Sequence, residues 1–194
     1  MSTIWLTADL HLGHKLVAGL RGFGEDTAAH DAELARRWDY LVKPDDQVRI
    51  LGDLCLGRRG LDYALDWVSQ RPGIKDLVFG NHDAGHPMHA ESHKVQADYL
   101  TVFRSAQQSG IQKIYGHRVM LSHFPFVADH TEGARYPEWR PKDAGQWLIH
   151  GHTHSDRRGF GRQIHVGLDA HGLAPVPVTW AASVMRAHEK EPTE

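Results

Sequence analysis

Short motifs containing histidine and aspartate recur along most of the chain, and each follows an apolar run typical of a β-strand. Asp9 and His11 are two residues apart, so on an extended segment their side chains point to the same side and can hold one ion together. His152 and His154 repeat this spacing. Similar positions after apolar runs are held by Asp53, Asn81 and His123. Mixed oxygen and nitrogen donors in this number suit two divalent cations, and the chemistry expected of such a pair is metal-assisted hydrolysis.

The apolar runs before these donors predict strands that end where the donor motifs begin. Five such strands are expected, at residues 3–8, 47–51, 76–79, 118–121 and 147–150. Further extended runs are expected at residues 111–115, at residues 163–166 and between Pro175 and Pro177. Gly116-His117 separates two of these runs and is typical of a two-residue hairpin turn, which predicts antiparallel pairing there.

Helical spacing is found between the predicted strands. In residues 27–41, Leu34 and Trp38 lie four residues apart, Thr27 can cap the start of a helix, and Pro44 stops it. Other helices are expected over residues 61–68, within residues 95–108 and from Thr179 to about residue 187, whereas residues 13–26 are expected to form a polar loop. Strands that alternate with helices predict an α/β domain, a class in which binding and catalysis are common at strand ends.

Length, composition and charge restrict the class of protein. The 194 residues fit a single domain, predicted to span residues 1–188, with residues 189–194 as a flexible tail. The N-terminus has no basic segment followed by a long apolar stretch, so neither secretion nor a membrane partner is expected, and a cytoplasmic location is predicted. The lone cysteine, Cys55, is interpreted as a small core residue. A net charge of -2 offers no general attraction to long nucleic acid.

In their order along the chain, the motifs resemble the calcineurin-like metallophosphoesterase superfamily. The order is Asp-x-His, Gly-Asp, Gly-Asn-His-Asp, a histidine and Gly-His-x-His, and the resemblance covers residues 4 to about 178. Residues 7–14, 122–125 and 166–172 look like a subgroup of small, single-domain prokaryotic and phage phosphoesterases. The resemblance implies a four-layer α/β/β/α sandwich, in which two mixed sheets are flanked by helices and a dinuclear metal site lies along one edge.

The resemblance also implies which donors share an ion. The first metal would be held by Asp9, His11, Asp53 and His154, and the second by Asp53, Asn81, His123 and His152. Asp53 stands in both sets because one carboxylate can bridge two ions about 3.5–4 Å apart. A donor set without thiolate suits divalent transition metals better than Ca²⁺. Manganese is the first choice, and Fe, Zn, Co and Ni stay open as alternatives.

His82 is the residue that the resemblance implies as a general acid. It would protonate the ester oxygen that leaves after in-line attack by a hydroxide bridging the two metals. Asp83 either orients the imidazole of His82 or caps the following turn. His14 either contacts the substrate phosphate or makes a hydrogen bond within its loop. Asp169 and His171 either orient ligand imidazoles from behind or belong to a turn rich in Asp and Gly.

The function expected from these residues is that of a dinuclear, metal-dependent phosphodiesterase acting on a small phosphoester or nucleotide, with 2′,3′-cyclic nucleotides among the candidate substrates. A phosphomonoesterase with the same core is the close alternative. A non-catalytic metal-binding interaction module is more distant, because every motif position is filled. A nuclease that works with partner subunits is disfavoured by the chain's size and charge. Six basic residues either gather substrate phosphates or solvate the surface: Arg135, Arg140 and Lys142 before His152, and Arg157, Arg158 and Arg162 after His154. The oligomeric state is left open by the sequence.

Overall fold

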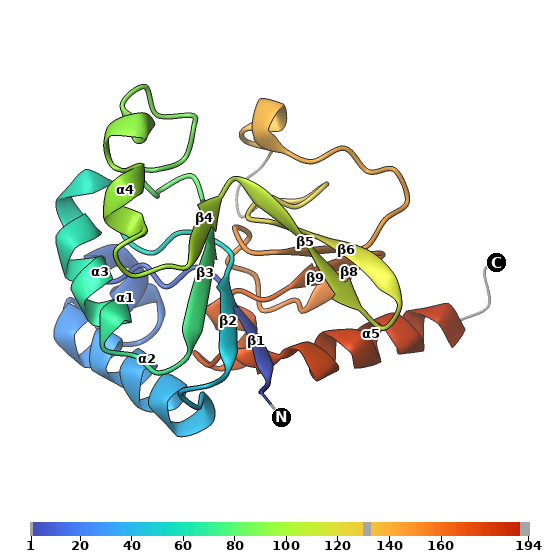
Figure 1. Cartoon of the computed structure of the whole chain (residues 1–194), viewed down its shortest axis with the longest axis horizontal. Helices are drawn as coiled ribbons and strands as arrows, with labels where there is room; N and C mark the ends of the chain where they lie inside the picture. The colour runs from blue at the N-terminus through green and yellow to red at the C-terminus, as the bar shows by residue number, and fades with distance from the viewer. Residues whose placement is uncertain (1, 130–132, 191–194) are drawn as a thin grey trace.

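Two five-stranded β-sheets form the centre of the structure, and helices flank them (Figure 1). The computed structural model describes residues 2–129 and 133–190. Each sheet contains both parallel and antiparallel neighbours, so both are mixed. The predicted α/β class, with two mixed sheets flanked by helices, is confirmed.

Sheet 1 brings three of the predicted donor segments to one edge. Its strands in spatial order are β10 (Val176–Pro177), β1 (Ile4–Thr7), β2 (Gln47–Ile50), β3 (Ile74–Val78) and β4 (Ser105–Gln107). β1, β2 and β3 are parallel neighbours, so their carboxyl ends lie side by side. Asp9, Asp53 and Asn81 follow these three ends, and they are therefore placed along the same edge.

Sheet 2 delivers the remaining donors in the same way. Its strands in spatial order are β5 (Ser109–Ile114), β6 (His117–Ser122), β7 (Leu148–His150), β9 (Gln163–His165) and β8 (Gly159–Phe160). β6 and β7 run parallel, so His123 and His152 follow neighbouring strand ends. A parallel bridge between Ala8 and Gly167 joins the segment after β1 to the segment after β9. The carboxyl edges of the two sheets consequently meet.

Two hydrophobic cores hold these layers together. α1 (Lys15–Leu20), α2 (Thr27–Leu41), α3 (Leu61–Ser69) and α4 (Gln96–Tyr99) lie on one side of sheet 1 (Figure 1). Between them and sheet 1, Trp38 and Trp67 pack with Val48 and Ile50. The second core lies between the sheets and includes Met185 of α5 (Val178–Lys190), a helix that contacts both sheets. Sheet 1 thus has a hydrophobic core on each face, although β2 and β3 carry Arg49 and Asp76 among their apolar residues. Cys55 is fully buried in the first core, as predicted.

Three predicted element boundaries are corrected by the structure. The polar loop at residues 13–26 contains α1, which His14 caps. α2 has the expected bounds, but Asp26 and not Thr27 is its cap, because the Asp26 carboxylate accepts from Ala29 N at 2.9 Å. α5 begins at Val178, before the expected cap Thr179.

The region from residue 95 to 108 and the hairpin also differ from expectation. The predicted helix is a single turn, α4, followed by β4, whose residues pair in parallel with β3. The hairpin between β5 and β6 turns at Tyr115 and Gly116, with φ of 49° and 84°, and not at Gly116 and His117. Positive φ at both positions is the geometry that favours a tight two-residue turn.

The C-terminal helix extends beyond the predicted boundary of the tail. Glu189 and Lys190 belong to α5, and the remaining tail residues, 191–194, lie outside the described residues. In residues 2–129 and 133–190, no helix is long and apolar enough to cross a bilayer.

Candidate metal centre

The donor segments continue the pairing of the strands that precede them. Beyond the strand ends, Asp9 N donates to Gly52 O at 3.0 Å, and His11 N donates to Asp53 O at 3.0 Å. In sheet 2, Gly151 N donates to the His123 carbonyl at 3.1 Å. These backbone bonds fix neighbouring segments in register, so the side chains that leave them converge on one place.

The predicted first ligand set converges around the imidazole of His11. His11 Nε2 lies 3.1 Å from His154 Nε2 and 3.6 Å from Asp53 Oδ2. Donor atoms of Asp9, His11 and His154 all lie within 4.8 Å of one another. This separation is short enough for one ion to contact all three.

The predicted second set converges on the amide oxygen of Asn81. Asn81 Oδ1 lies 2.9 Å from His152 Nδ1 and 3.1 Å from His123 Nε2. His123 Nε2 is also 3.4 Å from Asp53 Oδ2. Asp9, Asp53 and His123 form a further triad of donors within 4.8 Å of one another, so the Asp9 carboxylate lies close to donors of both ligand sets. Asp53 Oδ2 lies near both groups, 3.6 Å from His11 Nε2 and 3.4 Å from His123 Nε2.

The chemistry of this donor set fits divalent cations. His154 Nδ1 donates to Asp169 and His123 Nδ1 donates to the Leu51 carbonyl, so in each neutral ring Nε2 carries the lone pair. His152 is the neutral ring that faces Asn81: its Nε2 donates to Asp129, so its Nδ1 carries the lone pair and lies 2.9 Å from the Asn81 amide oxygen, which is also an acceptor. Acceptors that face acceptors at these distances repel one another unless a cation lies between them.

Burial sets the protonation of several of these groups. It lowers the pKa of His11 and of His152 to about 3, which keeps both imidazoles neutral and able to coordinate. Burial alone would raise the pKa of Asp53, but His123 and His11 outweigh it and hold that carboxylate ionised. Burial likewise opposes the charge on His123, yet Asp53 raises the His123 pKa to about 9. A metal that binds His123 would therefore displace a proton.

Backbone strain is concentrated at the predicted ligands. The described part of the chain has nine non-glycine residues with positive φ, and five of them are Asp9, His11, Asp53, His152 and His154, with φ between 48° and 72°. Such conformations cost of order 1–3 kcal/mol each and persist where surrounding contacts enforce them. Tight packing leaves no room to relax, since a Cβ at Gly80 would collide with the Asp53 carboxylate.

Each histidine of the Gly-His-Thr-His motif is oriented by a carboxylate that an arginine holds. His154 Nδ1 donates to Asp169 Oδ2 at 3.0 Å, and Arg21 makes two bonds of 2.8 and 3.0 Å to the same carboxylate. His152 Nε2 lies 3.2 Å from Asp129 Oδ2, to which Arg140 donates at 2.8 Å. Hydrogen bonds of this kind fix the tautomer and the ring orientation of a metal ligand.

Two of these positioning residues, Arg21 and Asp129, were not predicted. Arg21 lies in the segment expected to be a loop, and it also donates to the carbonyl of Asp9 at 2.7 Å. Asp129 lies in the segment between β6 and β7, outside any motif. Neither residue has a local pattern that could have identified it. Arg140, one of the basic residues considered for substrate phosphates, instead bonds to Asp129 and to backbone carbonyls.

His82 and Asp83 have different surroundings although they are adjacent. The His82 side chain is 36% exposed, and its ring centroid lies 5.3 Å from that of His11, so a substrate at the site can reach it. Asp83 is fully buried and accepts from the backbone N–H groups of Asp53, Leu54 and Gly80 at 2.8 to 2.9 Å. Asp83 therefore ties the Asp53 and Asn81 loops together, a structural role that differs from both alternatives, orienting His82 and capping the following turn.

The remaining candidates differ in their relation to the centre. His14 Nδ1 accepts from Val17 N at 3.2 Å, and this bond caps α1. Of the two alternatives for His14, the structure therefore shows the local hydrogen bond. The His14 ring is nevertheless close to the centre, with its centroid 5.6 Å from that of His11. His171 Nε2 donates to the His165 carbonyl at 2.9 Å. His171 therefore bonds to the backbone of β9, whereas Asp169 bonds to the imidazole of His154, one of the predicted ligands.

Comparison with known proteins adds relatives and a related fold. The Gene 66 protein of Mycobacterium phage L5 is 46% identical over 184 residues, covering 89% of this chain and 89% of that protein. The Gene 66 protein of Mycobacterium phage D29 is 44% identical over 189 residues, covering 91% and 93%. No protein-family model matches the chain.

Solved structures support the fold. The protein AQ665 from Aquifex aeolicus, a protein of unknown function, superposes with a TM-score of 0.70 at 22% identity, over 95% of this chain and 100% of that one. Phosphopantetheinyl hydrolase from Mycobacterium tuberculosis matches 71% of this chain and 48% of its own at a TM-score of 0.38 and 17% identity, too slight a likeness to bear on this chain.

Proposed function

The chain belongs to the family of the mycobacteriophage Gene 66 proteins, and we propose that it is a metal-dependent phosphoesterase with a preference for phosphodiesters. One observation carries the proposal. Donors from five strand ends converge in two groups on either side of Asp53, and the exposed imidazole of His82 stands beside them. A structural histidine cluster would not need strained backbone at five of its members.

In this proposal two divalent transition-metal ions, with manganese the first choice, occupy the two groups. Asp9, His11, Asp53 and His154 would hold one ion, and Asp53, Asn81, His123 and His152 the other. When bound, such a pair supplies an activated water and neutralises charge on the phosphoryl oxygens. Asp9 and Asp53 are the only carboxylates among the seven ligands, so the loaded centre keeps a positive charge that attracts a phosphoester.

The chain's own residues would then position and protonate the substrate. His82 N donates to Asp53 Oδ1 at 2.9 Å, so the backbone at His82 is fixed to the bridging carboxylate. Its imidazole, with Nε2 3.9 Å from Asp53 Oδ2, stands where it can give a proton to a departing alkoxide. Asp169 and Asp129 keep the two motif histidines turned toward the centre.

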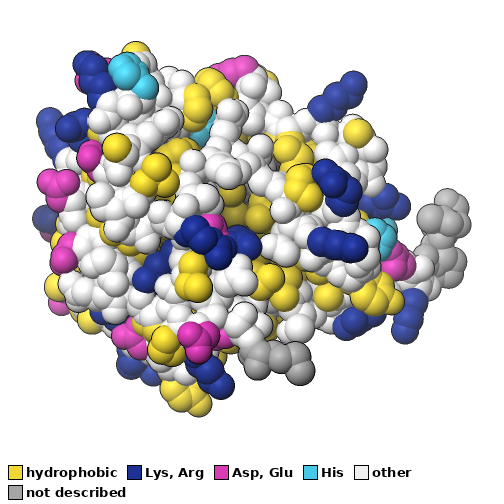
Figure 2. Space-filling view, in the orientation of Figure 1, with side chains coloured by type: hydrophobic (Ala, Val, Ile, Leu, Met, Phe, Trp, Pro, Cys, Tyr) yellow, Lys and Arg dark blue, Asp and Glu magenta, His cyan; other side chains and the backbone are white. Residues whose placement is uncertain are grey.

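A small substrate suits the charge of the chain, whose formal net charge at pH 7 is -2. On the face shown in Figure 2, some Lys and Arg side chains gather near the middle and the others stand apart, without a continuous track. Long nucleic acid needs a continuous cationic track. A small phosphodiester, such as a cyclic nucleotide, needs only the positive charge of the metal centre to attract it. A single domain over residues 1–188 and a cytoplasmic location are parts of the same proposal.

The test begins with protein stripped by a chelator and then titrated with Mn²⁺. We expect about two bound ions per chain, and hydrolysis of bis(p-nitrophenyl) phosphate that appears only with the metal. p-Nitrophenyl phosphate, measured under identical conditions, should be the poorer substrate by kcat/KM. Faster turnover of the monoester would assign a phosphomonoesterase, and two bound ions without hydrolysis of either ester would assign a non-catalytic metal-binding module.

A further inference from the structure

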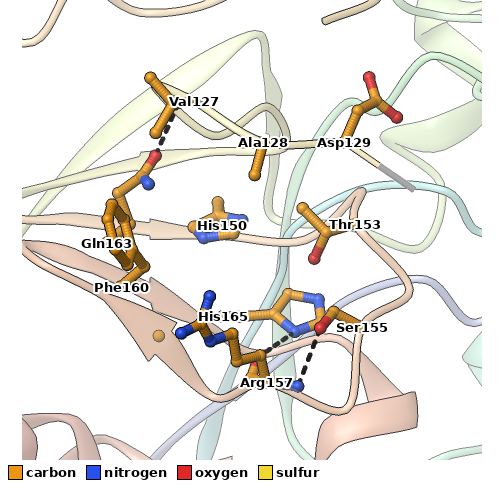
Figure 3. Close-up of a pocket in the computed structure, with 11 residues that line it drawn as sticks. Val127, Ala128, Asp129, His150, Thr153, Ser155, Arg157, Phe160, Gln163 and His165 are labelled. Carbon is orange, nitrogen blue, oxygen red and sulfur yellow. Dashed lines mark hydrogen bonds between the residues drawn. The ribbon is translucent and has the colours of Figure 1, made fainter. Parts of the chain in front are cut away.

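A cavity of about 380 Å³ lies on the outer face of sheet 2, beside the candidate metal centre (Figure 3). His150 and His165 are paired across β7 and β9, and their rings stack with centroids 5.3 Å apart. Gln163 shares their face, because it lies two residues before His165. Ile149 and Ile164, which alternate with them, point into the core between the sheets. The cavity is thus separate from that core and has a volume typical of ligand pockets.

Two polar atoms on its wall have fixed and opposite hydrogen-bonding character. His150 Nδ1 donates to the Gly151 carbonyl at 2.8 Å, so Nε2 of the neutral ring is an acceptor. Gln163 Oε1 accepts from Val127 N at 3.0 Å, which identifies the other amide atom as the NH₂ donor. Among residues 2–129 and 133–190, neither His150 Nε2 nor Gln163 Nε2 has a hydrogen-bond partner, although both side chains line the cavity.

The rest of the wall suits a flat, partly apolar ring. Val127 and Ala128 lie above the polar pair, and Phe160 lies at the mouth with 60% of its surface exposed (Figure 3). The guanidinium of Arg157 lies 5.6 Å from the centroid of the Phe160 ring. An occupant complementary to this wall presents an adjacent N–H donor and acceptor on a planar edge and an aromatic face to Phe160.

We propose that this cavity binds the base of a nucleotide whose phosphoester lies at the metal centre. Every nucleobase carries an adjacent donor and acceptor on its edge, which matches the acceptor of His150 and the donor of Gln163. The cavity and the centre share a wall, because Asp129 and Thr153 line the cavity while Asp129 also contacts His152. The assignment of the occupant as substrate rests on the proposed phosphoesterase function, whereas binding of the base does not.

Direct binding to the full-length, metal-free chain tests the cavity without any hydrolysis. Adenosine, guanosine, cytidine and uridine are titrated by NMR, with ribose 5-phosphate as the ligand that lacks a base. We expect at least one nucleoside to bind and ribose 5-phosphate to bind more weakly. Binding of ribose 5-phosphate as tight as that of every nucleoside would overturn the proposal, and so would the absence of nucleoside binding.

The variant Gln163→Glu keeps the oxygen that accepts from Val127 N and replaces only the donor that faces the cavity. We expect about ten-fold weaker nucleoside binding. Gln108→Glu makes the same charge change at an exposed position between β4 and β5 and should leave binding unchanged. Phe160→Ala, at the exposed mouth, is a second variant should the first not fold, and loss of stacking should again weaken binding about ten-fold. Unaltered binding in a folded Gln163→Glu protein or in Phe160→Ala contradicts the proposal.

Kinetics of the Mn²⁺-loaded enzyme separate the cavity from the centre. Gln163→Glu should lower kcat/KM for a 2′,3′-cyclic nucleotide about ten-fold while leaving bis(p-nitrophenyl) phosphate, which has no base, unaffected. An unchanged ratio of the two values would overturn the substrate assignment. Nucleoside binding without hydrolysis of either ester would remove the phosphoesterase function and retain the base site. Hydrolysis of both esters without nucleoside binding would remove the base site and retain the phosphoesterase function.

Discussion

The two halves of the candidate metal centre, which meet at Asp53, are supported by different kinds of structure. In the first half, His154 is oriented by Asp169, and Arg21 connects Asp169 to the Asp9 backbone from the end of α1. In the second half, His152 is oriented by Asp129, which Arg140 holds from the long segment between β6 and β7. Strand ends place the donors in both halves, but a helix end supports one half and a surface segment supports the other.

This difference indicates that the second half is the adjustable one. The segment that carries Asp129 and Arg140 also places Ala128 against the proposed base cavity. A ligand there would contact the same segment that orients His152. The residues that support the first half come instead from α1 and from the turn at residues 168–171, neither of which lines the cavity. We therefore expect substitutions in the two halves to have separable effects.

The largest effect on metal binding and on activity is expected at Asp53, where the two halves meet. Asp53→Asn keeps the shape of a side chain that is 1% exposed but removes the charge that both ions would share. We expect loss of both ions and a fall in kcat larger than the 10- to 100-fold typical of residues behind the ligands. Metal content by mass spectrometry and hydrolysis of bis(p-nitrophenyl) phosphate measure this, with circular dichroism to establish folding. Retention of two ions in a folded, active variant would show that Asp53 bridges nothing.

His82 belongs to neither half of the centre, so its substitution separates protonation of the leaving group from metal binding. His82→Ala should slow hydrolysis of alkyl phosphodiesters by roughly 10²- to 10⁴-fold and hardly affect nitrophenyl esters, whose leaving group needs no proton. Steady-state kcat on both substrates is the measurement, and the number of bound ions should stay at the wild-type value. Equal losses on both substrates would exclude His82 as the acid.

The carboxylates behind the histidines test the halves separately. Asp169→Asn and Asp129→Asn should each weaken the binding of one ion by about 10- to 100-fold, and the affected ion should differ between the variants. Stepwise Mn²⁺ titration calorimetry measures both affinities, and the exposed substitution Asp98→Asn serves as the matched control. If the two variants weakened the same ion, the division of the centre into separately supported halves would be wrong.

The smallest effect on the centre is expected from Asp46, which lies before β2 and supports the fold only. Its carboxylate accepts from Thr3 N at 2.7 Å, from Lys43 N at 3.0 Å and from the Trp5 indole at 2.9 Å. These donors lower the pKa of Asp46. Asp46→Asn should cost about 1–3 kcal/mol of unfolding free energy at pH 7.

The pH dependence of this cost has a definite sign. Since the folded-state pKa lies below the unfolded value of about 3.9, the ionised carboxylate stabilises the fold above that value, and its contribution falls as the pH drops through the folded pKa. Urea unfolding at several pH values should show the difference between wild type and variant shrinking below about pH 4. A difference that grew on acidification would contradict this assignment, and kcat at neutral pH should not change.

Much of the fold and the donor convergence could be predicted, because both depend on local pattern. An apolar run followed by a donor motif identifies a strand and its end, and parallel neighbours necessarily bring such ends together. The helix expected within residues 95–108 is present only as the single turn α4, because residues 105–107 pair with β3 and this pairing overrode local propensity. The proposed cavity had no sequence pattern at all, since it depends on which faces of β7 and β9 lack a covering element.

The positioning residues could not be predicted, for a physical reason. Arg21 and Asp169 are 148 residues apart in sequence, and Asp129 approaches His152 from a segment without regular pattern. Their contacts are created by the meeting of distant segments, which periodicity does not encode. The role of Asp83 stayed open between two alternatives for the same reason, because its partners Asp53 and Leu54 lie in another loop.

Anomalous diffraction from crystals of the Mn²⁺-loaded protein tests the central claim most directly. We expect two peaks about 3.5–4 Å apart, one beside Asp9, His11 and His154, the other beside Asn81, His123 and His152, with the Asp53 carboxylate between them. A single peak, or two peaks that do not share Asp53, would contradict it.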